Sequence, residues 1–114
     1  SIILALMASG LNGQQFAFHG YLPIKKNERT HKIKSLERLS KHEKQTEIFM
    51  ETPYRNEQLF NDILHNCQSQ SWLCVAADLT LPNQFIKTKR IREWKKLPKP
   101  SLHKRPAIFL LLSE

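Results

Sequence analysis

The sequence predicts an α/β domain in which a mixed sheet of about five strands is flanked by helices. Three observations support this fold class. Five short stretches have the alternating or continuous apolar pattern of strands, and the longer stretches between them carry apolar residues at helical spacing. The 114 residues include 40% hydrophobic residues and only three glycines, which is typical of one packed domain.

The first expected element is a helix over residues 1–9, an apolar run that ends before Gly10. Glycine readily adopts the left-handed conformation that follows the last turn of many helices. A helix that is apolar nearly all round is suited to burial. We therefore expect the chain to be one domain of a larger protein, in which a part that is missing here covers residues 2–8. The first strand is expected over residues 16–22, where hydrophobicity alternates before Pro23.

The second helix is expected to carry a narrow apolar stripe formed by Ile33, Leu36 and Leu39, with lysines and arginines on the remaining surface. Asn27 or Thr30 is expected to cap the N-terminus of this helix, because short polar side chains can accept hydrogen bonds from its free amides.

A short buried strand over residues 45–50 precedes the third helix. Thr52 and Pro53 form a favourable helix start, because the threonine oxygen can accept a free amide and proline loses no hydrogen bond at the first position. Apolar residues then recur on one wide helical face, at Leu59, Phe60, Ile63, Leu64 and Cys67.

Three further strands are expected after this helix. Trp72–Ala77 is apolar throughout. Residues 85–91 have the composition of an edge strand, in which Lys87 and Lys89 would prevent pairing with another chain. Ala107–Leu112 is continuously apolar, which is typical of a strand buried on both faces.

The net charge of +8 is concentrated in two segments. Residues 25–44 hold eight of the 18 lysines and arginines against three acids, and residues 87–105 hold nine against one acid. Two dense basic segments on a small domain suggest a polyanionic partner, most simply nucleic acid. A solvated surface that keeps the domain soluble is the alternative.

Several function classes lack support in the sequence. The chain contains no phosphate-binding loop, no dinucleotide-binding glycine motif and no zinc-hydrolase or serine-hydrolase motif. The five histidines are scattered, so no metal site is expected. No apolar run approaches the roughly 20 residues that span a bilayer. Cys67 and Cys74 are expected to be reduced thiols of a cytoplasmic protein.

The segment from Glu51 to Arg55 is the one local cluster suited to ligand binding. A strand is expected to end at Met50 and a helix to begin at Thr52, and ligands of α/β sheets bind at such strand ends. The free amides of residues 52–55 would suit an anion or a carboxylate. A plain capping arrangement, with Arg55 paired to Glu51 four residues earlier, is the alternative.

Three motifs carry a family resemblance. They are Ser-Ile-x-x-Ala-x-x-x-Ser-Gly-Leu at residues 1–11, Phe-Ala-Phe-His-Gly-Tyr-Leu-Pro-x-Lys at residues 16–25 and Thr-x-Ile-Phe-Met-Glu-Thr-Pro-Tyr-Arg at residues 46–55. In this order they resemble the S-adenosylmethionine-dependent tetrapyrrole methylase superfamily, and within it the branch of ribosomal RNA small subunit methyltransferase I. The resemblance covers most of residues 1–80. It implies a protein of two α/β domains with the cofactor between them, of which residues 1–114 are the C-terminal one.

The resemblance also implies site residues. S-adenosylmethionine would be contacted by Ser1, Ile2, Met50, Glu51, Ala76, Ala77, Pro106 and Ala107. Glu51 and Arg55 are the best local candidates for catalytic groups. Phosphates of ribosomal RNA would be held by a basic rim, formed by Lys25, Lys26, Arg29, Lys32 and Arg38.

The implied activity is 2′-O-methylation of small-subunit ribosomal RNA by a cytoplasmic homodimer. One segment departs from the branch, which usually reads Arg-Glu-Leu-Thr-Lys where this chain reads Ala-Asp-Leu-Thr-Leu at residues 77–81. The substrate therefore stays open at this point. The alternatives are a methylase of a tetrapyrrole or other small molecule, and a non-catalytic module for RNA binding or dimerisation.

Overall fold

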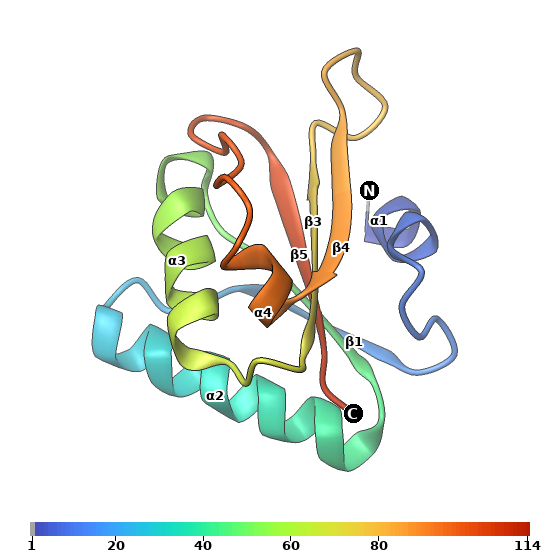
Figure 1. Ribbon diagram of the computed structural model, residues 1–114, viewed down its shortest axis with the longest axis vertical. Coiled ribbons are helices and arrows are strands. Elements are labelled where there is room, and N and C mark those ends of the chain that lie inside the picture. The colour runs from blue at the N-terminus through green and yellow to red at the C-terminus, as the bar shows by residue number, and fades with distance from the viewer. Residues whose placement is uncertain (1) are drawn as a thin grey trace.

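The computed structural model describes residues 2–114 and has a five-stranded mixed sheet with helices on both faces (Figure 1). The expected α/β fold class is therefore confirmed. The strand order across the sheet is β1-β2-β5-β3-β4. Only β1 and β2 are parallel, and the other neighbours are antiparallel. The strands are β1 (Phe16–Tyr21), β2 (Thr46–Met50), β3 (Trp72–Ala77), β4 (Phe85–Arg90) and β5 (Ala107–Leu112).

The last strand in sequence, β5, occupies the centre of the sheet and is buried along nearly its whole length, as its continuous apolar composition predicts. At one edge lies β4, where Lys87 and Lys89 were expected to prevent pairing with another chain.

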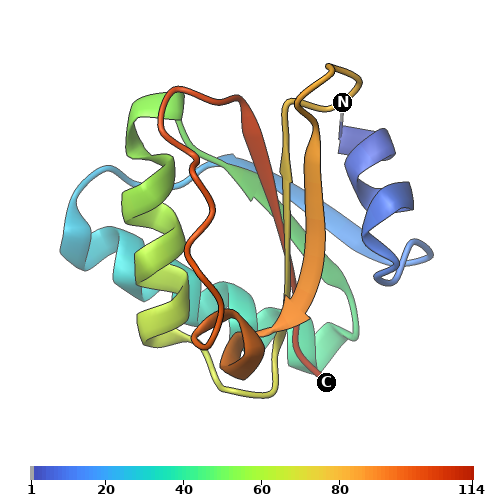
Figure 2. The same ribbon diagram turned by 45° about the horizontal axis from the view of Figure 1, so that its top comes forward.

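Helices cover the two faces of the sheet unequally (Figures 1 and 2). One face packs against α2 (Lys26–Glu43), α3 (Asn56–Asn66) and the short α4 (Ile91–Trp94), and the other packs against α1 (Ile2–Ser9). The larger core lies on the side of α2, α3 and α4. Aromatic rings pack together in this core. Phe49 is stacked on Phe109 with ring centroids 6.1 Å apart, and Phe60 lies edge-on to Trp94 with ring centroids 5.3 Å apart.

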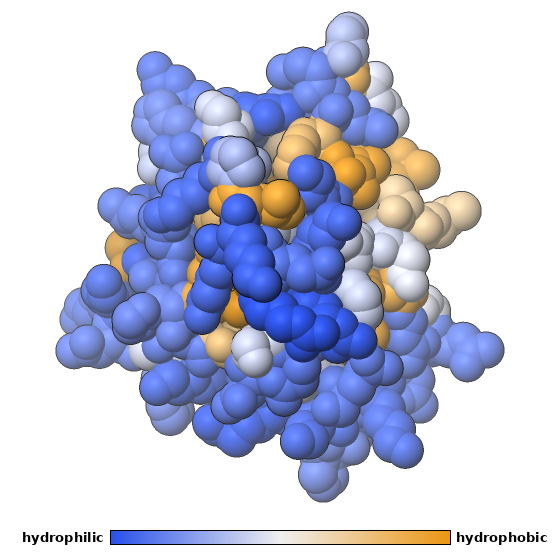
Figure 3. Space-filling view, viewed as in Figure 1, coloured by the Kyte–Doolittle hydropathy of each residue, from blue (hydrophilic) through white to orange (hydrophobic). Residues whose placement is uncertain are grey.

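The helix α1 is only half buried. Ala5 and Leu6 pack onto the sheet, whereas Ile3 and Met7 have exposed fractions of 55% and 75%. Figure 3 shows hydrophobic residues gathering on the side of the molecule where α1 lies. The sequence predicted a helix suited to burial, but within this domain the outer side of α1 remains apolar and exposed. Ser1 lies outside the described residues.

Two expectations for α2 are wrong. Lys25 is the N-cap residue and makes no side-chain capping bond, so neither Asn27 nor Thr30 caps the helix. Leu39 is exposed rather than buried. A period of 3.6 residues places Ser40, and not Leu39, on the face shared by Ile33 and Leu36. The buried face therefore combines apolar and polar side chains, namely Arg29, Ile33, Leu36, Glu37 and Ser40.

Candidate functional site

A cavity of about 400 Å³ lies at the end of the sheet where β2 and β3 end and β5 begins. The strand register brings its walls together, because Ile108 of β5 lies between Met50 of β2 and Ala76 of β3. This is the kind of position, at the carboxyl ends of strands, where α/β sheets bind ligands. The lining residues are Tyr21, Met50, Glu51, Pro53, Ala76, Asp78, Leu79, Leu81, Pro106, Ala107 and Ile108.

Five of the eight expected cofactor contacts share this cavity, namely Met50, Glu51, Ala76, Pro106 and Ala107. Their role in binding a cofactor stays a prediction. Ala77 does not line the cavity, because successive strand residues face opposite sides of the sheet and Ala77 belongs to the core beneath α2 and α3. Ile2 packs against the smaller core under α1 instead.

Glu51 is one of the two buried acidic residues of the cavity wall, with an exposed fraction of 3%. Its Oε1 accepts a hydrogen bond of 2.8 Å from the Thr52 amide and lies 3.2 Å from Arg55 Nε. The latter distance suits an ion pair, but its geometry is not that of a hydrogen bond. Glu51 Oε2 has no hydrogen-bond partner among the described residues. A buried carboxylate oxygen without a partner is costly, so this atom is suited to accept a donor from a ligand.

The expected anion site on the amides of residues 52–55 is wrong. The Thr52 amide is bonded to Glu51, the Arg55 amide donates to the Thr52 carbonyl at 2.9 Å, and Pro53 has no N–H. A 3-10 turn, η1 (Pro53–Arg55), precedes α3, and the Thr52 side chain makes no capping bond. The alternative interpretation, an ion pair between Arg55 and Glu51, is what the structure contains.

An ion pair at the rim was missed by the sequence analysis. Asp78 follows β3 directly, is buried, and adopts the left-handed backbone conformation with φ of 51°. Arg105 Nε donates to Asp78 Oδ2 at 2.6 Å, and the same guanidinium donates to the carbonyls of Ser101 and Asn83. Arg105 therefore joins the β3–β4 hairpin loop to the segment before β5. The available signal was an acidic residue directly after a buried strand.

An exposed aromatic ring stands beside the cavity. Tyr54 lies between the cavity residue Pro53 and Arg55, and its exposed fraction is 68%. Its ring meets that of His103 edge to face at 5.9 Å. An exposed ring in this position could stack on a flat aromatic group such as a nucleobase.

The expected basic rim is only partly on the surface. Lys25, Lys26 and Arg38 are exposed, and Lys32 is half-buried. Arg29 is wrong as an expected phosphate contact, because it is buried and bonds to Asp62 Oδ2 through Nε at 2.8 Å and Nη2 at 2.7 Å. Its guanidinium is therefore already neutralised inside the protein.

The two cysteines are free and buried, as expected for reduced thiols. Burial raises the pKa of both thiols, and the neighbouring Glu37 charge raises the pKa of Cys67 further. Within residues 2–114 no cluster of three or more His, Cys, Asp or Glu side chains is arranged to hold a metal ion. None of the described helices is long and apolar enough to cross a membrane.

Several sequence relatives carry the name ribosomal RNA small subunit methyltransferase I. The protein of Buchnera aphidicola subsp. Schizaphis graminum is 34% identical over 97 residues, which cover 82% of this chain and 33% of that protein. The protein of Vibrio cholerae is 34% identical over 93 residues, covering 82% and 31%. The chain thus spans about a third of the length of these relatives. No family model matches the chain.

Solved structures share the fold over nearly the whole chain. The methyltransferase CobJ matches with a TM-score of 0.61 at 14% identity, covering 99% of this chain and 47% of CobJ. A diphthine synthase matches with a TM-score of 0.59 at 15% identity, covering 99% and 45%. Uroporphyrin-III C-methyltransferase of Thermus thermophilus, complexed with S-adenosylhomocysteine, matches with a TM-score of 0.52 at 16% identity. The match covers 96% of this chain and 49% of that protein. In each case the chain corresponds to about half of the solved protein.

Proposed function

We propose that this chain, which belongs to the S-adenosylmethionine-dependent tetrapyrrole methylase superfamily, is part of a methyltransferase that acts on small-subunit ribosomal RNA. In this proposal residues 1–114 are the C-terminal domain and form one wall of the cofactor cleft. The observation that carries the proposal is the cavity at the ends of β2 and β3, which gathers the end of the third sequence motif with Ala76, Pro106 and Ala107.

The cavity fits a cofactor that is part apolar and part polar. Met50, Ala76 and Ile108 provide apolar walls, and the unpartnered Glu51 Oε2 provides a buried acceptor. S-adenosylmethionine has a flat base, hydroxyl and amine donors and a positively charged sulfonium, and it would supply an electrophilic methyl group. Charge attraction between the sulfonium and Glu51 would favour binding at this end of the sheet.

The proposed reaction forms a bond between a ribose 2′-oxygen and the methyl carbon while the bond from sulfur to that carbon breaks. The hydroxyl proton must leave, and the carboxylate of Glu51 is the local group able to accept it. Arg55, which lies 3.2 Å from Glu51, would stabilise negative charge on the oxygen. Holding the oxygen in line with the methyl group would supply much of the rate.

Basic side chains on one helix support RNA as the substrate. The exposed Lys25, Lys26 and Arg38 and the half-buried Lys32 belong to α2 or the residue before it and would contact phosphates. Tyr54 would stack on a base beside the target nucleotide. We further propose a homodimer, supported by the exposed apolar side of α1, and a cytoplasmic location, where ribosomal RNA would be the substrate.

Methyl transfer from radiolabelled S-adenosylmethionine tests this function. Unmodified small-subunit ribosomal RNA should acquire label in a position that resists alkaline hydrolysis, because a methylated 2′-oxygen cannot attack the adjacent phosphodiester. Uroporphyrinogen III, offered as an alternative acceptor, should remain unlabelled. Label on the tetrapyrrole alone would replace the RNA substrate with a small molecule, and binding of RNA without methyl transfer would favour the non-catalytic module.

A further inference from the structure

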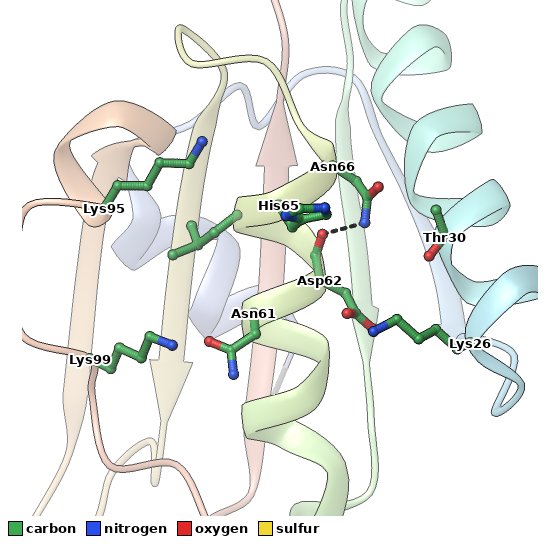
Figure 4. A pocket seen from close by; sticks show the side chains of 9 residues that line it. Lys26, Thr30, Asn61, Asp62, His65, Asn66, Lys95 and Lys99 are labelled. Atoms are coloured by element: carbon green, nitrogen blue, oxygen red, sulfur yellow. Dashed lines mark hydrogen bonds between the residues drawn. The ribbon is translucent and has the colours of Figure 1, made fainter.

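A second, larger hollow of about 720 Å³ lies on the helical face of the domain, away from the cavity described above. Figure 4 shows its two sides, with Lys26 and Thr30 of α2 on one side of α3 and Lys95 and Lys99 on the other. The exposed residues Asn61 and His65 of α3 lie between them. We call this hollow the lysine groove, defined by Lys26, Lys95, Lys99, Asn61 and His65.

The charge of the lysine groove is uncompensated. Lys26, Lys95 and Lys99 are exposed, and no ion pair engages them among the described residues. The one acid that lines the hollow, Asp62, is paired with the buried Arg29 at 2.7 Å and cannot neutralise the lysines. Three positive charges therefore surround a polar helix surface, which is suited to a ligand with several negative charges.

The lysine groove is where the two basic segments of the sequence meet. Lys26 belongs to residues 25–44, whereas Lys95 and Lys99 belong to residues 87–105, and only the packing of α2, α3 and α4 brings them together. Charges that only keep a protein soluble need not converge on one hollow. The convergence favours a bound polyanion over a plain solvated surface, which was the alternative interpretation of these segments.

The groove is connected to the cavity along the chain itself. The segment after α4 runs beside α3 up to the start of β5 (Figure 2). Along this segment, Lys99 lies in the groove, His103 contacts Tyr54, and Pro106 lines the cavity. The helix α3 begins just after the cavity residue Pro53, and His65 lies about 14 Å along it at 1.5 Å per residue. A nucleic-acid strand could therefore occupy both sites at once.

We propose that the lysine groove anchors the phosphate backbone of the RNA substrate a few nucleotides away from the nucleotide that enters the cavity. This inference rests on the proposed RNA methyltransferase function and adds the surface that holds the RNA. The lysines contact phosphates without reading sequence, and the chain from Lys99 to Pro106 directs the strand toward the cavity.

The test compares two triple variants of equal charge in the intact protein. Lys26→Ala, Lys95→Ala and Lys99→Ala remove the groove lysines, and Lys34→Ala, Lys41→Ala and Lys96→Ala remove three exposed lysines outside it. Binding of unmodified small-subunit ribosomal RNA is measured by fluorescence anisotropy at several salt concentrations. The groove variant should bind RNA roughly 10- to 100-fold more weakly than wild type. The slope of log K against log salt concentration should become shallower by about 2, because each of the three lost phosphate contacts contributes about 0.7.

The kinetic readouts separate anchoring from chemistry. The groove variant should raise KM for RNA while leaving kcat at saturating RNA and the affinity for S-adenosylhomocysteine unchanged. Equal losses of RNA affinity in the two triple variants would overturn the groove and leave the proposed methyltransferase in place. A wild-type protein that binds S-adenosylhomocysteine but neither binds nor methylates RNA would overturn both the groove and the RNA substrate.

Discussion

At the scale of single residues, the carboxylate of Glu51 differs from that of Asp78, the other acid of the cavity wall. Asp78 Oδ2 accepts hydrogen bonds from both Arg105 and Asn83, which hold this carboxylate in the structure. Glu51 has one oxygen bonded to the Thr52 amide and the other unpartnered inside the protein. A buried acceptor left open in this way is typical of sites that complete their hydrogen bonding with a ligand.

Replacing Glu51 with glutamine should separate function from stability. The amide oxygen of glutamine can still accept the Thr52 hydrogen bond, so the melting temperature should stay within about 2 °C of wild type. The loss of the negative charge should lower kcat/KM for methyl transfer at least 10-fold, equivalent to about 1.4 kcal/mol. Glu28→Gln on the exposed first turn of α2 is the control and should change neither quantity. A similar loss of activity in both variants would remove Glu51 from the site.

The buried thiols should make the protein less stable in alkaline solution. The pKa values of Cys67 and Cys74 are raised in the folded state, whereas a cysteine in the unfolded chain has a pKa of about 8.5. Above that pH the unfolded chain releases protons that the folded chain retains, so the free energy of unfolding falls as pH rises. Urea titrations between pH 7.5 and pH 10 should show a steeper fall for wild type than for the double variant Cys67→Ala, Cys74→Ala. Parallel curves would contradict a buried, protonated state of the thiols.

The sequence predicted cavity residues better than surface residues. Motif resemblance placed Met50, Glu51 and Ala107 at strand ends, where local pattern and sheet geometry agree. The prediction for Arg29 failed, because the local sequence does not distinguish an exposed arginine from a buried one. The partner of Arg29, Asp62, lies on another helix. The orientation of Ala77 was also missed, since a one-residue shift along a strand reverses the face.

At the scale of elements, α2 and α3 are joined by polar as well as apolar contacts. The pair of Arg29 and Asp62 links the two helices, and Glu37 of α2 accepts hydrogen bonds from the Gln68 amide and the Ser71 hydroxyl after α3. These contacts fix the relative position of the two helices and therefore the distance from Lys26 of α2 to the α3 surface of the lysine groove. They also explain why α2 has buried polar residues where the sequence predicted an apolar stripe.

Breaking the link between α2 and α3 should be costly. Arg29→Ala leaves the Asp62 carboxylate buried without its counter-charge, and a loss of about 3–5 kcal/mol in the free energy of unfolding is expected. Arg38→Ala, on the exposed side of the same helix, should change it by less than about 0.5 kcal/mol. Urea denaturation at neutral pH measures both. Equal stabilities of the two variants would show that the pair contributes nothing to holding the helices.

The helices and strands were largely predictable from local pattern, but the start of the third helix was not. The strands at Trp72–Ala77 and Ala107–Leu112 are as expected, because a short, continuously apolar segment in a small domain is typical of a buried strand. The third helix begins at Asn56 rather than Thr52, because residues 53–55 form a tighter 3-10 turn beside the cavity.

At the scale of the whole molecule, the site depends on the insertion of β5 between β2 and β3. Local sequence patterns predict that Ala107–Leu112 is a buried strand but do not state which strands are its neighbours. This arrangement brings Pro106 and Ala107 beside Met50 and Ala76, and so builds the cavity from segments that are distant in the sequence. The superfamily resemblance implied this proximity, whereas residue pattern alone did not.

The apolar outer side of α1 should form a dimer contact. Ile3→Glu together with Met7→Glu places charge on this surface without touching the buried Ala5 and Leu6, so the variant should fold and sediment as a monomer. Wild type and the control Ile24→Glu, an exposed residue before α2, should both sediment as dimers. A monomeric wild type would show that the protein does not form the proposed dimer. A double variant that is still dimeric would show that the dimer interface lies elsewhere.

A crystal structure from crystals grown with S-adenosylhomocysteine tests most directly whether the cofactor binds in the cavity. Ligand density is expected in the cavity at the ends of β2 and β3, in contact with Met50 and Ala107 and with a donor group within hydrogen-bond distance of Glu51 Oε2. Density for the ligand elsewhere on the domain, with the cavity filled by solvent at saturating ligand, would contradict binding of the cofactor in the cavity.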